Sequence, residues 1–212
     1  MQVSAGTLKV LITPKAELTE LKEHANWKHG AAVWLMLTFA GLAIYAAAEA
    51  RLGTGFIPLD FGAGLELLPI PILTAMAKAF ATLFIFIAIA HYVAKALGGK
   101  GNLETTFGLA CYEQMLAPLM GLTAAGLQFK FVSMRAAFYE ITTTGSIPDP
   151  FAYFGIYTVY LSVTVAIFTA WAFWIRSAAV SASHDLPYWP GLLSVFLAFA
   201  AIGLVNLGIS FI

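Results

Sequence analysis

The chain has 212 residues, of which 60% are hydrophobic and 10% are charged. A soluble domain typically carries about a quarter charged residues, so a chain this apolar cannot cover its surface with polar groups in water. Its eleven basic and eleven acidic residues give a formal net charge of zero, which removes the basic surface that a nucleic-acid-binding protein needs. The composition predicts an integral membrane protein without a nucleic-acid partner.

A polar segment, residues 1–30, comes before the first apolar run and is predicted to form a cytoplasmic tail. Its stretch TPKAELTELKEHANWKHG is typical of a short amphipathic helix, with Thr13 as the capping residue. Leu18, Leu21 and Ala25 would share one face of this helix. That face predicts docking on the membrane surface or on a partner protein, and the alternative is a solvated leader before the first span.

Five long apolar segments follow the tail and would make residues 31–212 a five-helix transmembrane domain. The predicted spans are residues 31–50, 68–97, 104–128, 151–176 and 188–212. Each has at least the ~20 residues that cross ~30 Å of hydrocarbon at ~1.5 Å per residue. Backbone polar groups in lipid need hydrogen-bond partners within their own segment, so the predicted fold is all-α. Pro118 predicts a kink in the third span.

The distribution of basic residues predicts the orientation. With the N-terminus in the cytoplasm, the cytoplasmic side would hold Lys9, Lys15, Lys22, Lys28, Lys95, Lys100 and Arg176, and the far side Arg51, Lys130 and Arg135. Five crossings then place the C-terminus on the side opposite the N-terminus. The AAAEA at 46–50 resembles a signal-peptidase site, but the basic region before it is too long and too mixed in sign for a cleaved signal.

A short glycine-rich connection joins the second and third spans. The GGKG element (Gly98, Gly99, Lys100 and Gly101) lacks the G-x-x-x-x-G-K-[ST] pattern of a phosphate-binding loop. Gly98 or Gly99 is instead expected to end a helix in a left-handed conformation. Asn102 is expected to cap the next helix. The sequence therefore predicts a cytoplasmic turn in a tight helical hairpin.

The same region resembles the signature of the Yip1 domain family. The residues that carry the resemblance are His91, Gly98, Gly99, Lys100, Gly101, Thr105, Tyr112 and Pro118. The segment 175–202 is also similar to the family's passage from its fourth helix through a short His-containing loop into the last helix. The resemblance covers about residues 61–212. It implies a five-helix membrane protein with a cytoplasmic N-terminus and without enzymatic activity. Its eukaryotic members are associated with vesicle traffic, membrane shaping and small-GTPase partners, and GTPase binding would follow from this resemblance alone.

The candidate functional residues among the ionisable side chains of the predicted spans are Lys78, His91 and Glu113, and more weakly Glu49. Such a side chain costs ~2.5–3.5 kcal/mol at the bilayer centre. Counted from the turn, His91 and Glu113 would lie at similar depths, ~10 and ~13 Å along two neighbouring helices. We expect these two side chains to face each other and to form an interhelical hydrogen bond, either as a static tie or as a pH-sensitive joint. Lys78 would lie ~30 Å from the turn, near the opposite interface.

No catalytic, cofactor-binding or metal-binding constellation is predicted. His24, His29 and His184 lack a second ligand at helical spacing, and the single Cys111 gives neither a disulfide nor a metal cluster.

The sequence therefore favours a non-catalytic scaffold, accessory subunit or membrane-organising and trafficking factor. Its expected partners are membrane lipids and other membrane proteins or a larger membrane complex. The alternative is a small transporter or channel that uses Glu113, His91 and Lys78.

Overall fold

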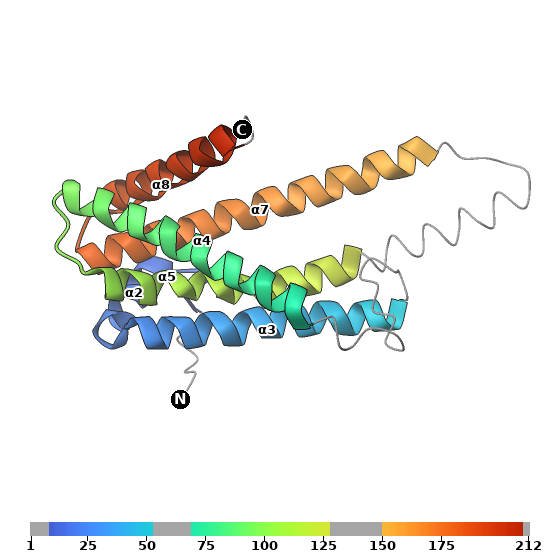
Figure 1. Cartoon of the computed structure of the whole chain (residues 1–212), viewed down its shortest axis with the longest axis horizontal. Coiled ribbons are helices and arrows are strands. Elements are labelled where there is room, and N and C mark those ends of the chain that lie inside the picture. Colours follow the sequence, from blue (N-terminus) through green and yellow to red (C-terminus); the bar gives the residue numbers. More distant parts are fainter. Residues whose placement is uncertain (1–8, 53–68, 128–149, 210–212) are drawn as a thin grey trace, which may run out of the picture. The chain divides into compact units, whose positions relative to one another are not determined.

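The computed structural model of the whole chain describes residues 9–52, 69–127 and 150–209, and every regular element in these ranges is a helix (Figure 1). In chain order these are α2 (Pro14–Leu21), the short 3-10 helix η1 (Lys22–His24), α3 (Trp27–Leu52), α4 (Pro69–Ala96), α5 (Leu103–Ala110), the 3-10 helix η2 (Cys111–Met115), the helical residues 116–127, α7 (Pro150–His184) and α8 (Tyr188–Ile209). The all-α prediction is confirmed for these residues.

Four of the described helices are long and apolar enough to cross a membrane. Their candidate spans are Trp27–Ile44, Met76–Ala96, Thr158–His184 and Tyr188–Val205. They correspond to four of the five predicted segments.

The remaining predicted segment, residues 104–128, is not one uninterrupted α-helix. Its path consists of α5, the 3-10 turns of η2 and the helical residues 116–127. Pro118 has no amide hydrogen to donate to the carbonyl of Gln114, four residues earlier, so the α-helical pattern of hydrogen bonds cannot continue through that residue. The irregularity that we expected at Pro118 therefore lies one turn before it.

The chain folds into two compact units, and parts of α3 and α7 belong to each. Unit 1 comprises Met1–Met36, Leu65–Met115 and Trp171–Ile212, and unit 2 comprises Leu37–Gly64 and Leu116–Ala170. Unit 1 thus holds α2, α4, α5, η2 and α8 whole, together with the start of α3 and the end of α7.

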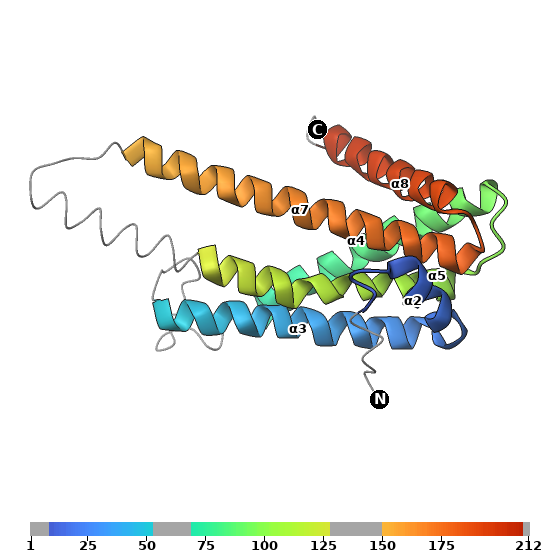
Figure 2. The ribbon, with the colours of Figure 1, turned by 180° about the vertical axis from the view of Figure 1, so that it is seen from behind.

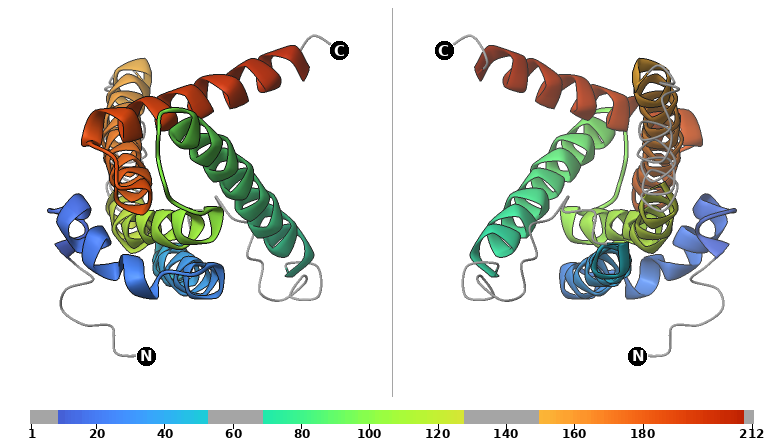
Figure 3. Two further views of the ribbon diagram at one scale, coloured as in Figure 1. Left: turned by 90° about the vertical axis from the view of Figure 1, so that its left-hand side faces the viewer. Right: turned by 90° about the vertical axis from the view of Figure 1, so that its right-hand side faces the viewer.

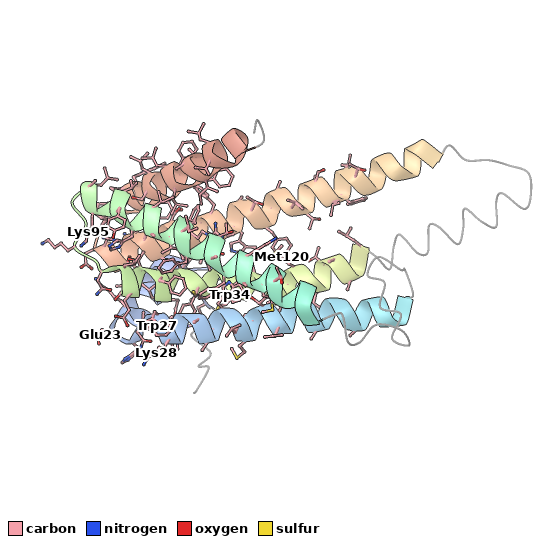
Figure 4. All side chains as sticks on the ribbon, viewed as in Figure 1. Glu23, Trp27, Lys28, Trp34, Lys95 and Met120 are labelled. Carbon is pink, nitrogen blue, oxygen red and sulfur yellow. The ribbon has the colours of Figure 1, made fainter. Side chains whose placement is uncertain are left out.

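Aromatic side chains form part of the core of unit 1. Phe80 of α4 packs edge-on against Phe107 of α5, with ring centroids 5.5 Å apart, and against Trp34 of α3 at 5.1 Å (Figure 4). Such T-shaped pairs place the positive edge of one ring against the negative face of the other. These contacts join α3, α4 and α5.

In unit 2, small residues let two backbones approach closely. A Cβ atom on Gly41 of α3 would lie 2.6 Å from the carbonyl oxygen of Ala117, and one on Gly121 would lie 2.6 Å from the carbonyl oxygen of Gly41. Helices in lipid associate through such small-residue contacts because close approach increases van der Waals packing.

Helix α7 extends further than predicted, because residues 177–184 continue it beyond Arg176. Serine hydroxyls in this stretch bond back to carbonyls of the helix itself, as when the Ser177 Oγ donates to the Phe173 carbonyl at 2.7 Å. Arg176 therefore lies eight residues before the end of α7, or about 12 Å along the helix axis. It lies within the helix and is not its last residue, as the predicted span 151–176 had it.

Candidate functional site

The connection between α4 and α5, residues 97–102, forms the hairpin around which the site is built. Gly98 has a φ of +93°, a conformation open to glycine but costly for other residues, and this ends α4. The Gly99 amide then donates to the Ala94 carbonyl at 2.9 Å. The predicted cap of α5 is confirmed, because the Asn102 side chain accepts a hydrogen bond from the Thr105 amide at 2.7 Å.

The hairpin backbone lies directly against the last residue of α7. The Lys100 amide donates to the His184 carbonyl at 3.1 Å, and the Gly101 amide donates to the His184 Nδ1 at 3.2 Å. A Cβ atom on Gly99 would lie 2.5 Å from that same Nδ1, and one on Gly101 would meet the Ser183 carbonyl. Glycine is required at both positions because any side chain would push the hairpin away from α7.

Behind the hairpin lies a buried polar group, here called the histidine cluster, made of His91, Thr106, Ser183 and His184. The two histidines lie 2.9 Å apart from His184 Nε2 to His91 Nδ1. The Thr106 Oγ1 lies 3.2 Å from His91 Nδ1 and 3.1 Å from Ser183 Oγ, and it donates at 2.7 Å to the Asn102 carbonyl. The cluster therefore joins α4, α5 and α7 through neutral groups.

The N-terminal tail packs against the same end of unit 1, as Figures 2 and 3 show from behind and end-on. Lys22 forms an ion pair of 2.6 Å with Asp185, in the connection between α7 and α8. The Trp171 indole of α7 donates to the Leu11 carbonyl at 2.9 Å. Thr13 makes no side-chain cap on α2, and its hydroxyl donates instead to the Lys9 carbonyl at 3.4 Å.

The predicted docking face of the tail is largely covered by the protein itself. Leu18 is fully buried, Ala25 is buried and Leu21 is half-buried. The tail is therefore neither a solvated leader nor a free docking face in this structure.

A second polar group of unit 1 is the ion pair between the buried Glu113 of η2 and the half-buried Arg176 of α7. Both carboxylate oxygens accept from the guanidinium: one from Nη2 at 2.6 Å, the other from Nε. The guanidinium also lies 4.5 Å from the centre of the Phe86 ring on α4. A bidentate pair with a cation–π contact satisfies the carboxylate without water.

The predicted hydrogen bond between His91 and Glu113 is replaced by these two separate groups. His91 bonds to His184 and Thr106, whereas Glu113 bonds to Arg176. Both residues lie in unit 1. Their equal distance from the turn along the chain does not determine the direction in which each side chain points around its helix. The 3-10 turns of η2 change that direction at Glu113, and Arg176 inside α7 offers a stronger partner than a neutral imidazole.

The remaining predicted site residue, Lys78, does not join either group. It is exposed on α4, thirteen residues before His91, or about 20 Å along the helix. His184, which the sequence did not mark as a site residue, is a central residue of the site. The signal that could have found it was the short His-containing segment in the family resemblance.

The described ranges bring no three histidine, cysteine, aspartate or glutamate residues together as a metal-binding group. In the histidine cluster, His184 Nε2 and His91 Nδ1 are hydrogen-bonded to each other, and His184 Nδ1 accepts from the hairpin. What this arrangement can do chemically is hold and exchange protons and lock three helices together.

The long apolar helices make the protein an integral membrane protein of the polytopic helical class. The model of the Yip1 domain matches residues 8–210, nearly the whole chain, and the protein belongs to this family. The match begins well before residue 61, so it includes the tail as well as the hairpin and the histidine cluster. Comparisons with curated proteins and with solved structures gave no match.

Proposed function

We propose that this Yip1 domain protein is a non-catalytic scaffold or accessory subunit that organises other membrane proteins through lateral contacts of α7 and α8. The family is generally one of non-enzymatic membrane proteins, with which a membrane-associated trafficking role is consistent. The observation that carries the proposal is the exposure of α7 in its apolar part. Only 6% of the apolar stretch that makes it a candidate span is buried within the protein.

The exposed residues of α7 do not form a single stripe. Val159, Tyr160 and Leu161 are consecutive and all exposed, and successive residues of an α-helix point ~100° apart. Together they cover more than half of the circumference of the helix. A spanning helix that packs only against its own bundle would bury one side, so this exposure favours a helix that also packs against other chains.

Helix α8 supplies a second exposed apolar surface. Its large exposed side chains include Leu193, Phe196, Phe199, Leu204 and Val205, while Val195 and Ala198 are buried against the protein. Because Leu18 and Ala25 of the tail are already covered, we assign partner binding to these helices and not to the tail.

We further propose five crossings with a cytoplasmic N-terminus. The hairpin at 97–102 and the connection at 185–187 meet at one end of unit 1, through the bonds of Lys100 and Gly101 to His184. If both connections lie on the same side, α7 must return from the far side. The chain between residues 103 and 149 must then cross an odd number of times. The path through α5, η2 and residues 116–127 is about 37 Å long at 1.5 Å per residue, which is enough for that crossing.

The alternative of a transporter or channel loses its support, because its three predicted residues do not gather. Glu113 is neutralised by Arg176, His91 bonds to a second histidine, and Lys78 is exposed elsewhere on α4.

Photo-cross-linking in the native membrane tests the proposed partner contacts. A photoreactive phenylalanine analogue would be placed at Val163 of α7 and at Phe196 of α8, with matched positions at the buried Val180 and Val195 on the same helices. We expect adducts with membrane proteins of defined mass at the two exposed positions and none at the buried ones. Adducts with lipid alone, together with ion flux into liposomes that Glu113→Gln abolishes, would favour the transporter instead.

Thiol labelling tests the number of crossings. In a Cys111→Ser background, cysteines at Lys100 and Pro187 would be exposed to a membrane-impermeant maleimide in sealed vesicles. Five crossings predict that both react from the same side, and that a cysteine added after Ile212 reacts from the other. Reaction of positions 100 and 187 from opposite sides would require four crossings.

A further inference from the structure

The hydrogen bonds of the histidine cluster fix the proton positions on its two rings. The Gly101 amide donates to His184 Nδ1, so that nitrogen carries no proton. A neutral His184 must then carry its proton on Nε2, which lies 2.9 Å from His91 Nδ1. His91 Nδ1 accepts that bond and is therefore also unprotonated. Every donor in this chain of bonds faces an acceptor only while both rings are neutral.

Adding one proton to either ring places two donors against each other. On His184 the new proton would sit on Nδ1 and face the Gly101 amide. On His91 it would sit on Nδ1, where the Thr106 Oγ1 at 3.2 Å can accept it, but the Nε2 proton of His184 would lose its acceptor. Because both side chains are buried, water cannot readily replace the lost acceptor. Protonation of His184 therefore weakens the bond that holds the hairpin to α7. Protonation of His91 weakens the bond that joins α7 to α4.

The charged groups around the cluster do not favour the imidazolium form. Lys95 of α4 and Lys22 of η1 are the positive charges whose fields act on His184. Asp185, the next residue, is paired with Lys22. Glu104 of α5 and Lys100 of the hairpin are exposed to solvent.

From this geometry we propose that the histidine cluster is a proton-operated latch. At neutral pH it holds the hairpin against the end of α7, and one proton taken up by the His91–His184 pair releases it. Release would free the glycine-rich hairpin, and with it the surface on which the tail packs through Lys22 and Asp185. This inference concerns the end of unit 1, and it stands whether or not α7 and α8 bind partners.

Spin-label mobility on the full chain in lipid nanodiscs tests the latch. A nitroxide would be attached at Lys100→Cys in a Cys111→Ser background, because the Lys100 side chain is exposed. Its spectrum would be followed from pH ~8 to ~3.5, past the range in which an ordinary histidine takes up a proton, because burial and the nearby lysines oppose the charged form of the pair. We expect a shift from an immobile to a mobile spectral component on acidification, reversed on return to pH ~8.

Two substitutions distinguish the latch from a general effect of acid. His184→Asn keeps an acceptor near the position of Nδ1 but cannot take up a proton in this range, so the hairpin should remain immobile throughout. The matched control, His24→Gln, changes an exposed histidine of the tail and should respond like the parent. An unchanged spectrum in the parent, or an equal shift in His184→Asn, would overturn the proposal.

A measurement on the unmodified chain covers the case in which His184→Asn does not fold. The ring-nitrogen NMR signals of ¹⁵N-labelled histidine report directly which nitrogen carries the proton. At neutral pH we expect His184 to be protonated on Nε2 alone, and doubly protonated forms to appear in the pH range where the spin label becomes mobile. The opposite tautomer at neutral pH, or double protonation without mobilisation of the label, would contradict the latch.

Discussion

The histidine cluster and the Glu113–Arg176 pair both lie in unit 1. The cluster is fully buried and built from neutral groups, whereas the pair joins a buried carboxylate to a half-buried guanidinium. The cluster holds three helices and a hairpin through several ordinary hydrogen bonds, each contributing about 0.5–1.5 kcal/mol. The ion pair holds η2 to α7 through one bidentate contact. Loss of one partner leaves the cluster with a weakened bond but leaves the ion pair with an unpaired charge. Removal of one partner should therefore lower the unfolding free energy more at the ion pair than at the histidine cluster.

The largest effect is expected from breaking the ion pair on one side. Arg176→Gln leaves the Glu113 carboxylate, whose side chain is 5% exposed, without its cation. Removal of one partner of a buried pair costs about 3–5 kcal/mol of unfolding free energy. Denaturant titration of the purified protein in detergent would measure this loss. The double variant Glu113→Leu, Arg176→Met removes both charges and should recover most of the stability, and equal losses in the two variants would contradict the argument.

Crowding the hairpin should have the next largest effect. Gly101→Ala places a methyl group against the Ser183 carbonyl, so the hairpin must move away from α7. Overpacking of this kind costs about 1–3 kcal/mol. Gly203→Ala is the matched control, because a Cβ there meets nothing within 4 Å and alanine favours the helix. Thermal unfolding of the two variants should separate them clearly, and a Gly101→Ala protein as stable as the control would show that the contact is loose.

A smaller effect is expected from removing one hydroxyl of the histidine cluster. Thr106→Val keeps the shape of the side chain but removes the donor to the Asn102 carbonyl and the contact with His91. We expect a loss of about 1 kcal/mol in unfolding free energy. Thr106→Ser retains the hydroxyl and serves as the control for the hydrogen bond. A loss of stability in Thr106→Ser with none in Thr106→Val would show instead that the methyl group, and not the hydroxyl, is the stabilising part.

The smallest effect is expected at the exposed ion pair that ties the tail to the connection between α7 and α8. The side chains of Lys22 and Asp185 are 28% and 64% exposed, so water and salt screen their attraction. Lys22→Ala should cost only about 0.2–1 kcal/mol, and less at high salt. Proteolysis of the tail at low and high salt would measure its release. A loss as large as that of Arg176→Gln would mean that the tail contributes far more than this one pair.

Local sequence patterns predicted the local structure well. A left-handed glycine after α4, either Gly98 or Gly99, and Asn102 as the cap of α5 both follow from the chemistry of a few neighbouring residues. The apolar runs predicted five spans, and four of them are long apolar helices in the described residues, because length and hydrophobicity are properties of a segment by itself.

The partners of the buried polar residues could not be predicted in the same way. The predicted span ends at Arg176, but the alanines and serines that follow continue α7 to His184. That extension brings Arg176 to Glu113 and His184 to His91. Pairing across helices depends on such lengths and on the rotation of each helix, and neither can be read from hydropathy.

The distance along the chain between Glu113 and Arg176 has a consequence for biosynthesis. The two residues are separated by 63 positions, which a ribosome translating ~5–20 residues per second covers in roughly 3–13 s. In the proposed five-crossing topology, the carboxyl group reaches the membrane before its counter-ion has been made. It must then enter the lipid as the neutral acid, or wait beside the insertion channel until α7 emerges. On the second route, the third crossing is completed only when the fourth arrives.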